Sequence, residues 1–510
     1  MERLRRQFGL GMIPLVFFLV WNLPLSLPSN AQRLAAVFAA VVTAWITEAL
    51  PLAVTALLIG PALVVTGVAD ARTAFQPYAD PVLFIFIGGF FIAHAMALYG
   101  LDRRIAYALL NLPGIRSVPS RARFTLLMTT GFLSMWVSNT ATAAIMMPIA
   151  LGAIEGGRDK NMDWSKRKAV TKSLLATAYA ASVGGLGSLV GSPPNLIAAR
   201  FLQRFMPEFG FVSWMKIALP VTLVLLLVTY AFLFYGDAAT RRALQNVDEE
   251  ARHHATHRPS LGAMSRGEWT TLAAFLLAAI GWIVPGTLEA AGLPLGHTLN
   301  RLLPPGAVAM FASSLLFFVP SKEGELDPLL QHSQETTLDC VPISPHRRLI
   351  SPVLPWSEAT KIDWGIIFLF GGGISLGQQL FDTGLARILA DVFVQSTGVR
   401  SLWALTFIAT LFTIFFTEVC SNTATANMLL PIVIAVAQGI GVSPLPPALG
   451  VALASSCAFM LPIATGPNAV VYGSGQVPQS AMIRTGFGLN WIAFAVLMLM
   501  LRILCPLFGW

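Results

Sequence analysis

The sequence predicts an all-α polytopic membrane protein with about 11 transmembrane helices and two re-entrant hairpins, arranged as an inverted repeat. Three observations predict this fold class. Charged residues make up 11% of the 510 residues, where a soluble chain carries about a quarter, and the mean hydropathy is +0.69. Many segments reach the roughly 20 apolar residues that a bilayer crossing requires. A short polar motif also occurs twice, at equivalent positions of two halves.

Apolar stretches of the required length follow one another along the chain and predict the individual crossings. Two others, about 124–156 and 402–440, carry a polar motif near the centre, which predicts re-entrant hairpins that enter and leave on one side. The predicted crossings are roughly 11–28, 33–50, 52–69, 81–100, 168–199, 212–236, 267–285, 303–320, 362–384, 446–474 and 488–508.

The distribution of basic residues predicts how the chain is oriented. With a cytoplasmic N-terminus, 24 of the 33 Lys and Arg residues lie in cytoplasmic segments, and the opposite orientation inverts this ratio. We therefore expect a multi-pass protein of a bacterial plasma (inner) membrane with its N-terminus cytoplasmic and its C-terminus outside. The net charge of +8 is explained by loops that face anionic membrane lipid, so no nucleic acid partner is expected.

The predicted organisation is an N-terminal helix followed by two repeats with a linker between them. The basic start and the apolar stretch after it resemble a signal peptide, but the length of the stretch and the spans that follow predict an uncleaved helix. An odd number of helices per repeat inverts the second repeat relative to the first. A polar loop at 321–361 is expected to carry no chemistry. The segments are 1–32 (N-terminal helix), 33–236 (first repeat), 237–266 (cytoplasmic linker) and 267–510 (second repeat).

The duplicated motif is Ser138-Asn139-Thr140, which returns 283 positions later as Ser421-Asn422-Thr423. Each copy opens the run Ser-Asn-Thr-Ala-Thr-Ala. The same offset relates Ser134 to Thr417 and extends back over the preceding helix. A duplication of this extent in apolar surroundings predicts a membrane transporter built from two structural repeats.

The motif residues suit an anion together with a monovalent cation. Neither motif region contains Lys or Arg, so backbone dipoles and co-bound cations must neutralise a bound anion. A helix broken at the motif frees backbone N–H groups, while an Asn amide offers oxygen to a cation and NH2 to an anion. The four-residue spacing of Ser134 and Ser138, repeated in Thr417 and Ser421, predicts two hydroxyls on one helical face. Ligands without a carboxylate favour a monovalent cation over calcium.

A second pair of matching segments interrupts apolar helices with glycine and proline. Gly191-Ser192-Pro193-Pro194-Asn195 corresponds to Ala464-Thr465-Gly466-Pro467-Asn468 at an offset of 273. Each interruption frees backbone carbonyls for a cation and directs a hydroxyl, Ser192 or Thr465, toward the interior. For any one segment the alternatives are a packing kink, or hydroxyls that bond to their own backbone. The four segments together favour one shared site at the middle of the membrane.

These paired motifs resemble the divalent anion/sodium symporter family, and the resemblance spans nearly the full chain. It implies a homodimer that carries a small divalent anion by alternating access, with a scaffold domain and a moving transport domain (an elevator mechanism). The implied activity is sodium-coupled symport of a C4-dicarboxylate such as succinate or malate. Sodium is then the coupling ion, and no other cofactor and no enzymatic role are expected. Sodium-independent dicarboxylate exchange and sulfate transport are the alternatives.

The resemblance also implies which residues bind. Cys420 stands where a small residue such as alanine is expected, which is tolerable if a main-chain carbonyl binds the ion. Gly466 stands where some relatives have proline, which leaves the size preference open. One sodium site would be formed by Ser134, Ser138, Asn139 and the backbone near Gly191, and the other by Thr417, Cys420, Asn422 and the backbone near Ala464. The implied substrate-binding residues are Ser138, Asn139, Thr140, Ser192, Ser421, Asn422, Thr423 and Thr465.

Three further signals lie outside the motifs. The segment 373–377 matches the nucleophile-elbow pattern of hydrolases, but it lies in an apolar helix and predicts helix packing, with an intramembrane hydrolase as the enzyme alternative. Glu48 is expected to act at a helix end, because Pro51 follows it. Glu418 is expected either to carry a proton or tune the second cation site, or to be protonated and bonded to a neighbouring helix.

Overall fold

The computed structural model describes residues 2–25, 27–110, 119–152, 163–236, 238–253, 262–321 and 351–510. Within these ranges every regular element is a helix, and the one β contact is an isolated bridge between Pro320 and Pro352. The predicted all-α class is therefore confirmed. The predicted loop 321–361 falls mostly outside the described residues.

The first half begins with two antiparallel helices that pack closely on each other, followed by short helices that lead into the first motif. Its helices are α1 (Glu2–Asn22), α2 (Ser29–Thr47), α3 (Leu52–Val65), α4 (Ala71–Phe75), η1 (Gln76–Ala79), α5 (Leu83–Tyr99), α6 (Leu101–Leu110), α7 (Pro119–Ser134), α8 (Asn139–Gly152), α9 (Trp164–Gly184), α10 (Pro193–Leu202) and α11 (Phe211–Tyr235). The predicted linker contains a helix of its own, α12 (Ala238–His253).

The second half repeats this order from α18 onward. Its helices are α13 (Arg266–Ala290), α14 (Pro294–Leu302), α15 (Pro305–Phe318), α17 (Trp356–Ala359), α18 (Trp364–Asp382), α19 (Leu385–Thr397), α20 (Leu402–Phe416), α21 (Asn422–Gly439), α22 (Leu445–Ala454), α23 (Gly466–Gly473) and α24 (Gln479–Leu507).

Five continuous helical segments among the described residues are long and apolar enough to cross a membrane, and two bent pairs raise the number to seven. The predicted count of eleven is not reached by this test and stays a prediction. The count is lower because the motif-bearing segments are split into shorter helices that do not pass the test singly. For example, α9 and α10 are separated by a break at 185–192, and α22 and α23 by a break at 455–465.

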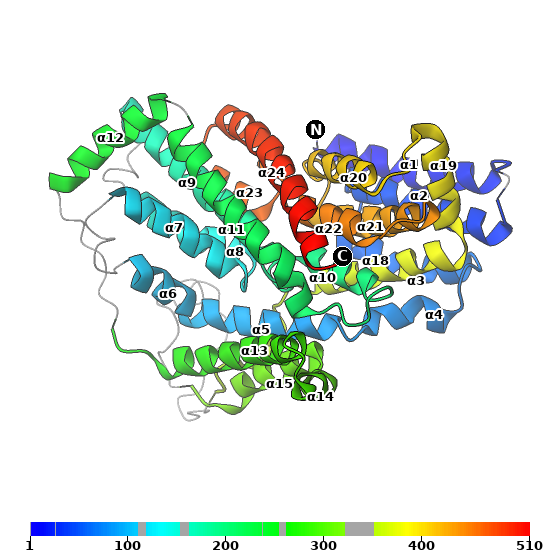
Figure 1. Cartoon of the computed structure of the whole chain (residues 1–510), viewed down its shortest axis with the longest axis horizontal. Helices are drawn as coiled ribbons and strands as arrows, with labels where there is room; N and C mark the ends of the chain where they lie inside the picture. Colours follow the sequence, from blue (N-terminus) through cyan, green and yellow to red (C-terminus); the bar gives the residue numbers. More distant parts are fainter. Residues whose placement is uncertain are drawn as a thin grey trace, which may run out of the picture.

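The two broken helices interlock the halves. The second arm of the first broken helix, α10, packs against α21 and α22 of the second half. Conversely α23, the second arm of the other broken helix, packs against α8 and α9 of the first half. Figure 1 shows these crossings near the centre of the molecule, with α7, α8, α9 and α11 to one side and α20, α21 and α22 to the other. Each break therefore lies beside the motif of the opposite half.

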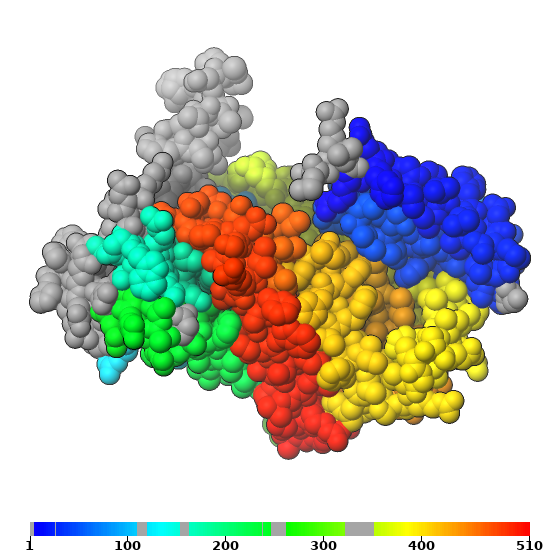
Figure 2. All heavy atoms as spheres, turned by 90° about the horizontal axis from the view of Figure 1, so that it is seen from above, coloured from blue at the N-terminus to red at the C-terminus, as the bar shows by residue number. Residues whose placement is uncertain are grey.

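The remaining helices flank this centre. α5 packs with α13 and α15, and α18 packs with α3. In the space-filling view, α24 runs across one face between first-half and second-half elements (Figure 2). Small residues permit the closest crossings: a Cβ atom on Gly184 of α9 would overlap the backbone of Gly131 in α7. This contact fixes the arm of the first hairpin against the broken helix beside it.

Candidate functional site

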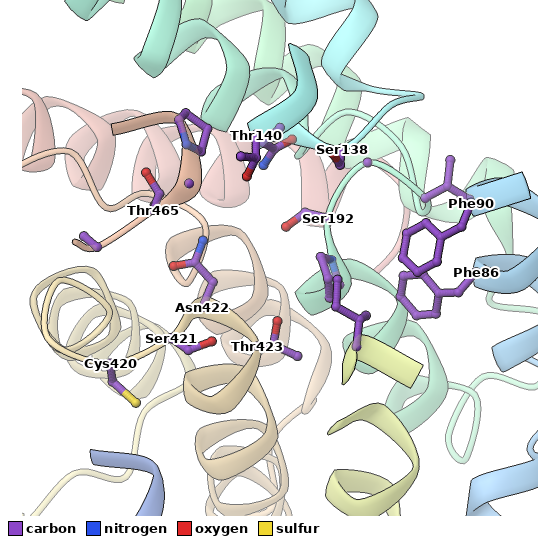
Figure 3. Close-up of a pocket in the computed structure, with 18 of the residues that line it drawn as sticks. Phe86, Phe90, Ser138, Thr140, Ser192, Cys420, Ser421, Asn422, Thr423 and Thr465 are labelled. Atoms are coloured by element: carbon purple, nitrogen blue, oxygen red, sulfur yellow. The ribbon is translucent and has the colours of Figure 1, made fainter. Parts of the chain in front are cut away.

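A cavity of about 350 Å³ lies where the four motif segments meet, within the range of roughly 300–1,000 Å³ typical of small-molecule sites. Figure 3 shows hydroxyl and amide groups from both halves around it. Phe86, Phe90 and Trp136 form an apolar part of the wall. All eight predicted substrate-binding residues line this cavity: Ser138, Asn139, Thr140, Ser192, Ser421, Asn422, Thr423 and Thr465.

Four helix N-termini converge on the cavity. α8 begins at Asn139 and α21 at Asn422, so each Ser-Asn-Thr motif opens a helix, as the sequence predicts. α10 and α23 also begin at the cavity, behind the N-cap residues Ser192 and Thr465. Helix N-termini present unpaired N–H groups and a partial positive charge. The predicted chain interruptions thus supply anion-attracting helix ends as well as free carbonyls.

The first motif also forms a cluster of oxygen atoms behind the cavity wall. One atom of the Asn139 side-chain amide lies 2.7 Å from Ser134 Oγ and 3.2 Å from the carbonyl oxygens of Ala181 and Gly191. These partners identify the atom as the amide nitrogen, Nδ2. Ser134 Oγ donates to Ala181 O at 2.6 Å. Ser134 is fully buried at the end of α7, while Asn139 and Gly191 line the cavity. Hydroxyl, amide and carbonyl oxygens of this kind suit a small hard cation.

The second motif repeats this arrangement. Thr417 Oγ1 lies 2.9 Å from Asn422 Oδ1 and 2.8 Å from the carbonyl oxygen of Ser455. Thr417 is fully buried, while Cys420 and Ala464 line the cavity nearby. Two hydroxyl–amide–carbonyl clusters thus adjoin one cavity, and the other residues predicted for the cation sites, Ser138, Cys420 and Ala464, line that cavity.

One prediction about these clusters is wrong. α7 ends at Ser134 and α20 ends at Phe416, so Ser134 and Ser138, like Thr417 and Ser421, do not share a helical face. The chain turns between them, and Ser138 Oγ instead accepts from Ala141 N at 3.3 Å as a cap of α8. The four-residue spacing fails because the helix stops at the motif.

Two asparagines hold the interruptions in place. Asn195 Nδ2 donates to Gly185 O (2.8 Å) and Ser188 O (2.7 Å). Asn468 Nδ2 donates to Ala458 O (3.2 Å) and Leu461 O (3.0 Å). Both pairs of acceptors lie ten and seven residues before the asparagine, so the two breaks have the same internal geometry. Because these amides point into their own loops, they shape the site rather than line it.

Direct contacts also join the halves at the cavity. Ser192 Oγ lies 2.8 Å from Ser456 Oγ, across the interface between the two broken helices. Thr140 packs so closely on Gly466 that a Cβ atom there would overlap its hydroxyl. Glycine at this position therefore makes room for the first motif against the second break.

Glu418 accepts hydrogen bonds from several groups that the sequence did not indicate. Its carboxylate accepts hydrogen bonds from three successive backbone amides of the second break, Phe459 N (2.7 Å), Met460 N (2.9 Å) and Leu461 N (3.2 Å). Asn490 Nδ2 of α24 donates to it at 2.8 Å. The three backbone groups can only donate, so the carboxyl oxygens of Glu418 are the acceptors in this cradle. No side-chain pattern could reveal this cradle, because three of the four partners are backbone groups.

The signals outside the motifs are structural in the described residues. Ser375 is buried in α18 and donates to Ala74 O at 2.8 Å, and a Cβ atom on Gly373 would overlap the Asn427 side chain of α21. This confirms helix packing as the role of 373–377.

Glu358, which faces His94 at 3.3 Å, also accepts from Lys361 at 2.6 Å. Burial raises the pKa of Glu358, but these two hydrogen bonds outweigh it and hold the pKa below its usual value.

A polar cavity enclosed by two related halves, with broken helices pointing into it, defines the class of secondary membrane transporters. The family model described as the sodium:sulfate symporter transmembrane region matches residues 5–510. The chain belongs to this family, and it is a multi-pass membrane transport protein rather than an enzyme.

Individual relatives agree over nearly the full length. The sodium-dependent dicarboxylate transporter SdcS of Staphylococcus saprophyticus is 34% identical over 507 residues, which cover 98% of this chain and 91% of the relative. SdcS of Staphylococcus aureus is 34% identical over 506 residues, with the same two coverages. Among solved structures, the YdaH transporter of Alcanivorax borkumensis aligns with a TM-score of 0.50 at 15% identity over 86% of each chain, which shows a shared fold.

Proposed function

We propose that this protein is a sodium-coupled symporter of a C4-dicarboxylate such as succinate or malate. The observation that carries the proposal is the cavity of about 350 Å³ at which four helix N-termini and two oxygen clusters meet. The sodium-dependent dicarboxylate transporters of Staphylococcus, similar over 98% of the chain, support the same activity.

The dianion is held by backbone dipoles and neutral side chains. Its two carboxylates accept from the N–H groups that begin α8 and α21, and from the motif hydroxyls and amides. The N-caps of α10 and α23 close the site from the other two directions. Because the donors come from both halves, an extended molecule with a carboxylate at each end fits better than a compact one.

The apolar wall favours a dicarboxylate over sulfate. Phe86, Phe90 and Trp136 line the cavity without offering a charge to an anion. Methylene groups between two carboxylates can pack on these rings, whereas sulfate has no apolar part to bury. Sulfate remains the competitor to test, since the family description names it.

The two oxygen clusters would bind sodium, with Ser134, Ser138, Asn139 and Gly191 at one and Thr417, Cys420, Asn422 and Ala464 at the other. Each central hydroxyl has a single proton but two oxygen neighbours, a carbonyl and the end of an Asn amide. At Asn139, whose inward amide atom also faces the carbonyl oxygens of Ala181 and Gly191, the NH2 therefore faces the hydroxyl. A sodium ion reverses this preference, because it attracts the amide oxygen and leaves the NH2 for the substrate. This makes dianion binding depend on prior sodium binding.

Transport then requires the loaded site to reach both sides of the membrane in turn. We propose alternating access by an elevator movement of the motif-bearing helices against a scaffold that forms a homodimer in the lipid bilayer. The N-terminus is placed in the cytoplasm and the C-terminus outside, in the plasma membrane of a bacterium, since this puts most basic residues on the inner side.

Uptake into proteoliposomes tests the proposal. Labelled succinate is offered with and without an inward sodium gradient, in competition with malate, citrate, α-ketoglutarate and sulfate. Asn139→Ala and Asn422→Ala should each lower sodium-driven uptake by about 10- to 100-fold, because each removes hydrogen bonds to a charged substrate. Asn22→Ala is the matched control, because among the described residues this exposed amide bonds only to Phe18 O.

Three results would contradict the proposal. Near-normal uptake in either cavity variant would exclude the assigned sites. Full exchange in potassium without sodium would identify a dicarboxylate exchanger, and uptake of sulfate that succinate does not compete would identify a sulfate transporter.

A further inference from the structure

An ion pair lines the central cavity at the end nearest the N-terminus. Arg5 of α1 donates through Nη2 to Oε2 of Glu48, the residue that follows α2. Both side chains belong to the wall of the cavity that the motifs form, with 35% and 40% of their surface exposed. Among the described lining residues, Arg5 is the one Lys or Arg. The cavity wall therefore combines the neutral motif groups and two acidic residues, Glu48 and Glu418, with one cationic side chain.

The backbone is shaped to bring this pair together. Glu48 caps α2 in the left-handed conformation (φ 46°), the one residue other than glycine with positive φ in the described chain. Such a conformation is unfavourable for an L-residue and persists where other contacts enforce it. Gly9 lies one turn after Arg5 on the same face of α1, and a Cβ atom there would overlap Thr47. The missing side chain lets α1 approach the end of α2 at the position of the ion pair.

Arg5 keeps capacity for a second partner. Among the described residues its hydrogen-bond acceptor is Glu48, which it meets through Nη2, and 35% of its side chain is exposed. A guanidinium is a rigid fork that can bind a carboxylate through two N–H groups at once. A carboxylate arriving at the rim can therefore compete with Glu48 for Arg5, and it meets the first positive side chain on its way to the neutral site.

We propose that Arg5 and Glu48 form a charge gate for the dianion at this mouth of the cavity. Arg5 receives one substrate carboxylate as the dianion enters or leaves, and Glu48 holds Arg5 while no substrate passes. This inference rests on the proposed function. Since Glu48 and the substrate compete for one guanidinium, the two residues act in opposite directions on substrate affinity.

The test measures KM separately from the two faces of proteoliposomes in which the protein has a single orientation. At the face where the N-terminus lies, Arg5→Gln should raise KM about two- to fivefold, as expected for loss of a partly exposed charge pair. Glu48→Gln frees Arg5, so it should lower KM at that face and slow release of product there. Arg5→Lys, which keeps the charge but loses the fork, should fall between Arg5→Gln and the unchanged protein.

Arg6→Gln is the matched control, because it removes the same charge one residue away and Arg6 is not part of the cavity wall. A purely structural pair would give a different result: Arg5→Gln and Glu48→Gln would lower the melting temperature alike and shift KM in the same direction, or not at all. That outcome, with normal uptake by the unchanged protein, would overturn the gate and leave the proposed function standing. Absence of sodium-driven uptake in the unchanged protein would overturn both.

Discussion

The two hairpin tips occupy equivalent positions but are anchored by different chemistry. In the first half, Ser188 Oγ donates to the carbonyl oxygen of Met135 and accepts from Gly191 N at 3.2 Å. In the second half, the position equivalent to Met135 is Glu418, whose carboxylate binds three successive amides of the break at 459–461. A hydroxyl group in one half and a carboxyl group in the other thus perform the same connection between tip and break.

This difference teaches which parts of the site must be symmetric. The hydroxyl–amide clusters and the asparagines of the breaks are repeated, since each half must present similar oxygens to the cavity. The anchor behind each tip is free to differ, provided that it fixes the distance between tip and break. The second half is held by three successive backbone amides that donate to one carboxyl group, whereas in the first half one backbone amide donates to the anchoring hydroxyl. We therefore expect the second half to be the more rigid and the more sensitive to substitution.

The largest expected effect comes from replacing the carboxyl group of the second anchor. Glu418→Gln places an NH2 group against amide donors, so it should destabilise the protein by about 3 kcal/mol and abolish most sodium-driven uptake. Met135→Leu at the equivalent position keeps the backbone carbonyl and should cost less than about 1.5 kcal/mol. Thermal unfolding in detergent compares the two, and equal losses would refute the asymmetry of the anchors.

The next effect concerns how each hairpin arm packs on its broken helix. Gly184→Ala forces a Cβ atom into the backbone of Gly131, so it should destabilise the first half by about 1–3 kcal/mol. Gly450→Ala in α22 meets the end of the Thr410 side chain, which can rotate, and alanine favours the helix. We expect the melting temperature to fall for Gly184→Ala only. A larger loss for Gly450→Ala would show that the crossing in the second half is the tighter one.

A smaller effect is expected from the asparagines that hold the breaks. Asn195→Ala and Asn468→Ala each remove two hydrogen bonds to loop carbonyls, with an expected cost of about 1–3 kcal/mol. The bonds of Asn195 are shorter (2.8 and 2.7 Å against 3.2 and 3.0 Å), so its loss should be greater. The sodium concentration for half-maximal uptake should rise in both variants. If the free energy of unfolding fell while the sodium concentration for half-maximal uptake stayed the same, the breaks would not shape the cation clusters.

The smallest effect is predicted for Cys420, which aligns with Val137 at the repeat offset of 283. If its main-chain carbonyl serves the second cation cluster, Cys420→Ala should leave sodium affinity within about twofold of the unchanged protein. Val137→Ala is the matched substitution in the first half. A strong loss of sodium affinity in Cys420→Ala alone would assign the thiol itself a role that the neutral-oxygen site does not include.

The sequence predicted the residues of the site better than the packing of the helices that carry them. The repeat offset was sufficient to bring Asn139 and Asn422 to one cavity, because equivalent residues of an inverted repeat lie around its axis. The crossing of α10 and α23 into opposite halves could not be predicted, since it depends on tertiary packing between short apolar arms. The shared helical face of Ser134 and Ser138 was wrong, because helical periodicity holds only while the helix continues.

Two charged residues show the same limit. Glu418 was predicted to lie within the membrane, but its partners are backbone amides, which have no signature in a sequence. Glu48 was predicted to end a helix and does so, yet its pairing with Arg5 joins positions 43 residues apart. Apolar surroundings in the sequence show that a carboxylate is unusually placed. The folded structure is needed to show which group pairs with it.

The neutral groups contributed by the two motif copies affect how readily a partly filled site can cross the membrane. A lone dianion among these groups retains its double charge, and carrying uncompensated charge through the bilayer interior costs several kcal/mol. Two sodium ions beside it would reduce the net charge of the cargo to zero. Under the proposed sodium coupling, partly filled forms would cross rarely because of their own electrostatic self-energy, which would preserve the sodium gradient without any separate element that senses occupancy.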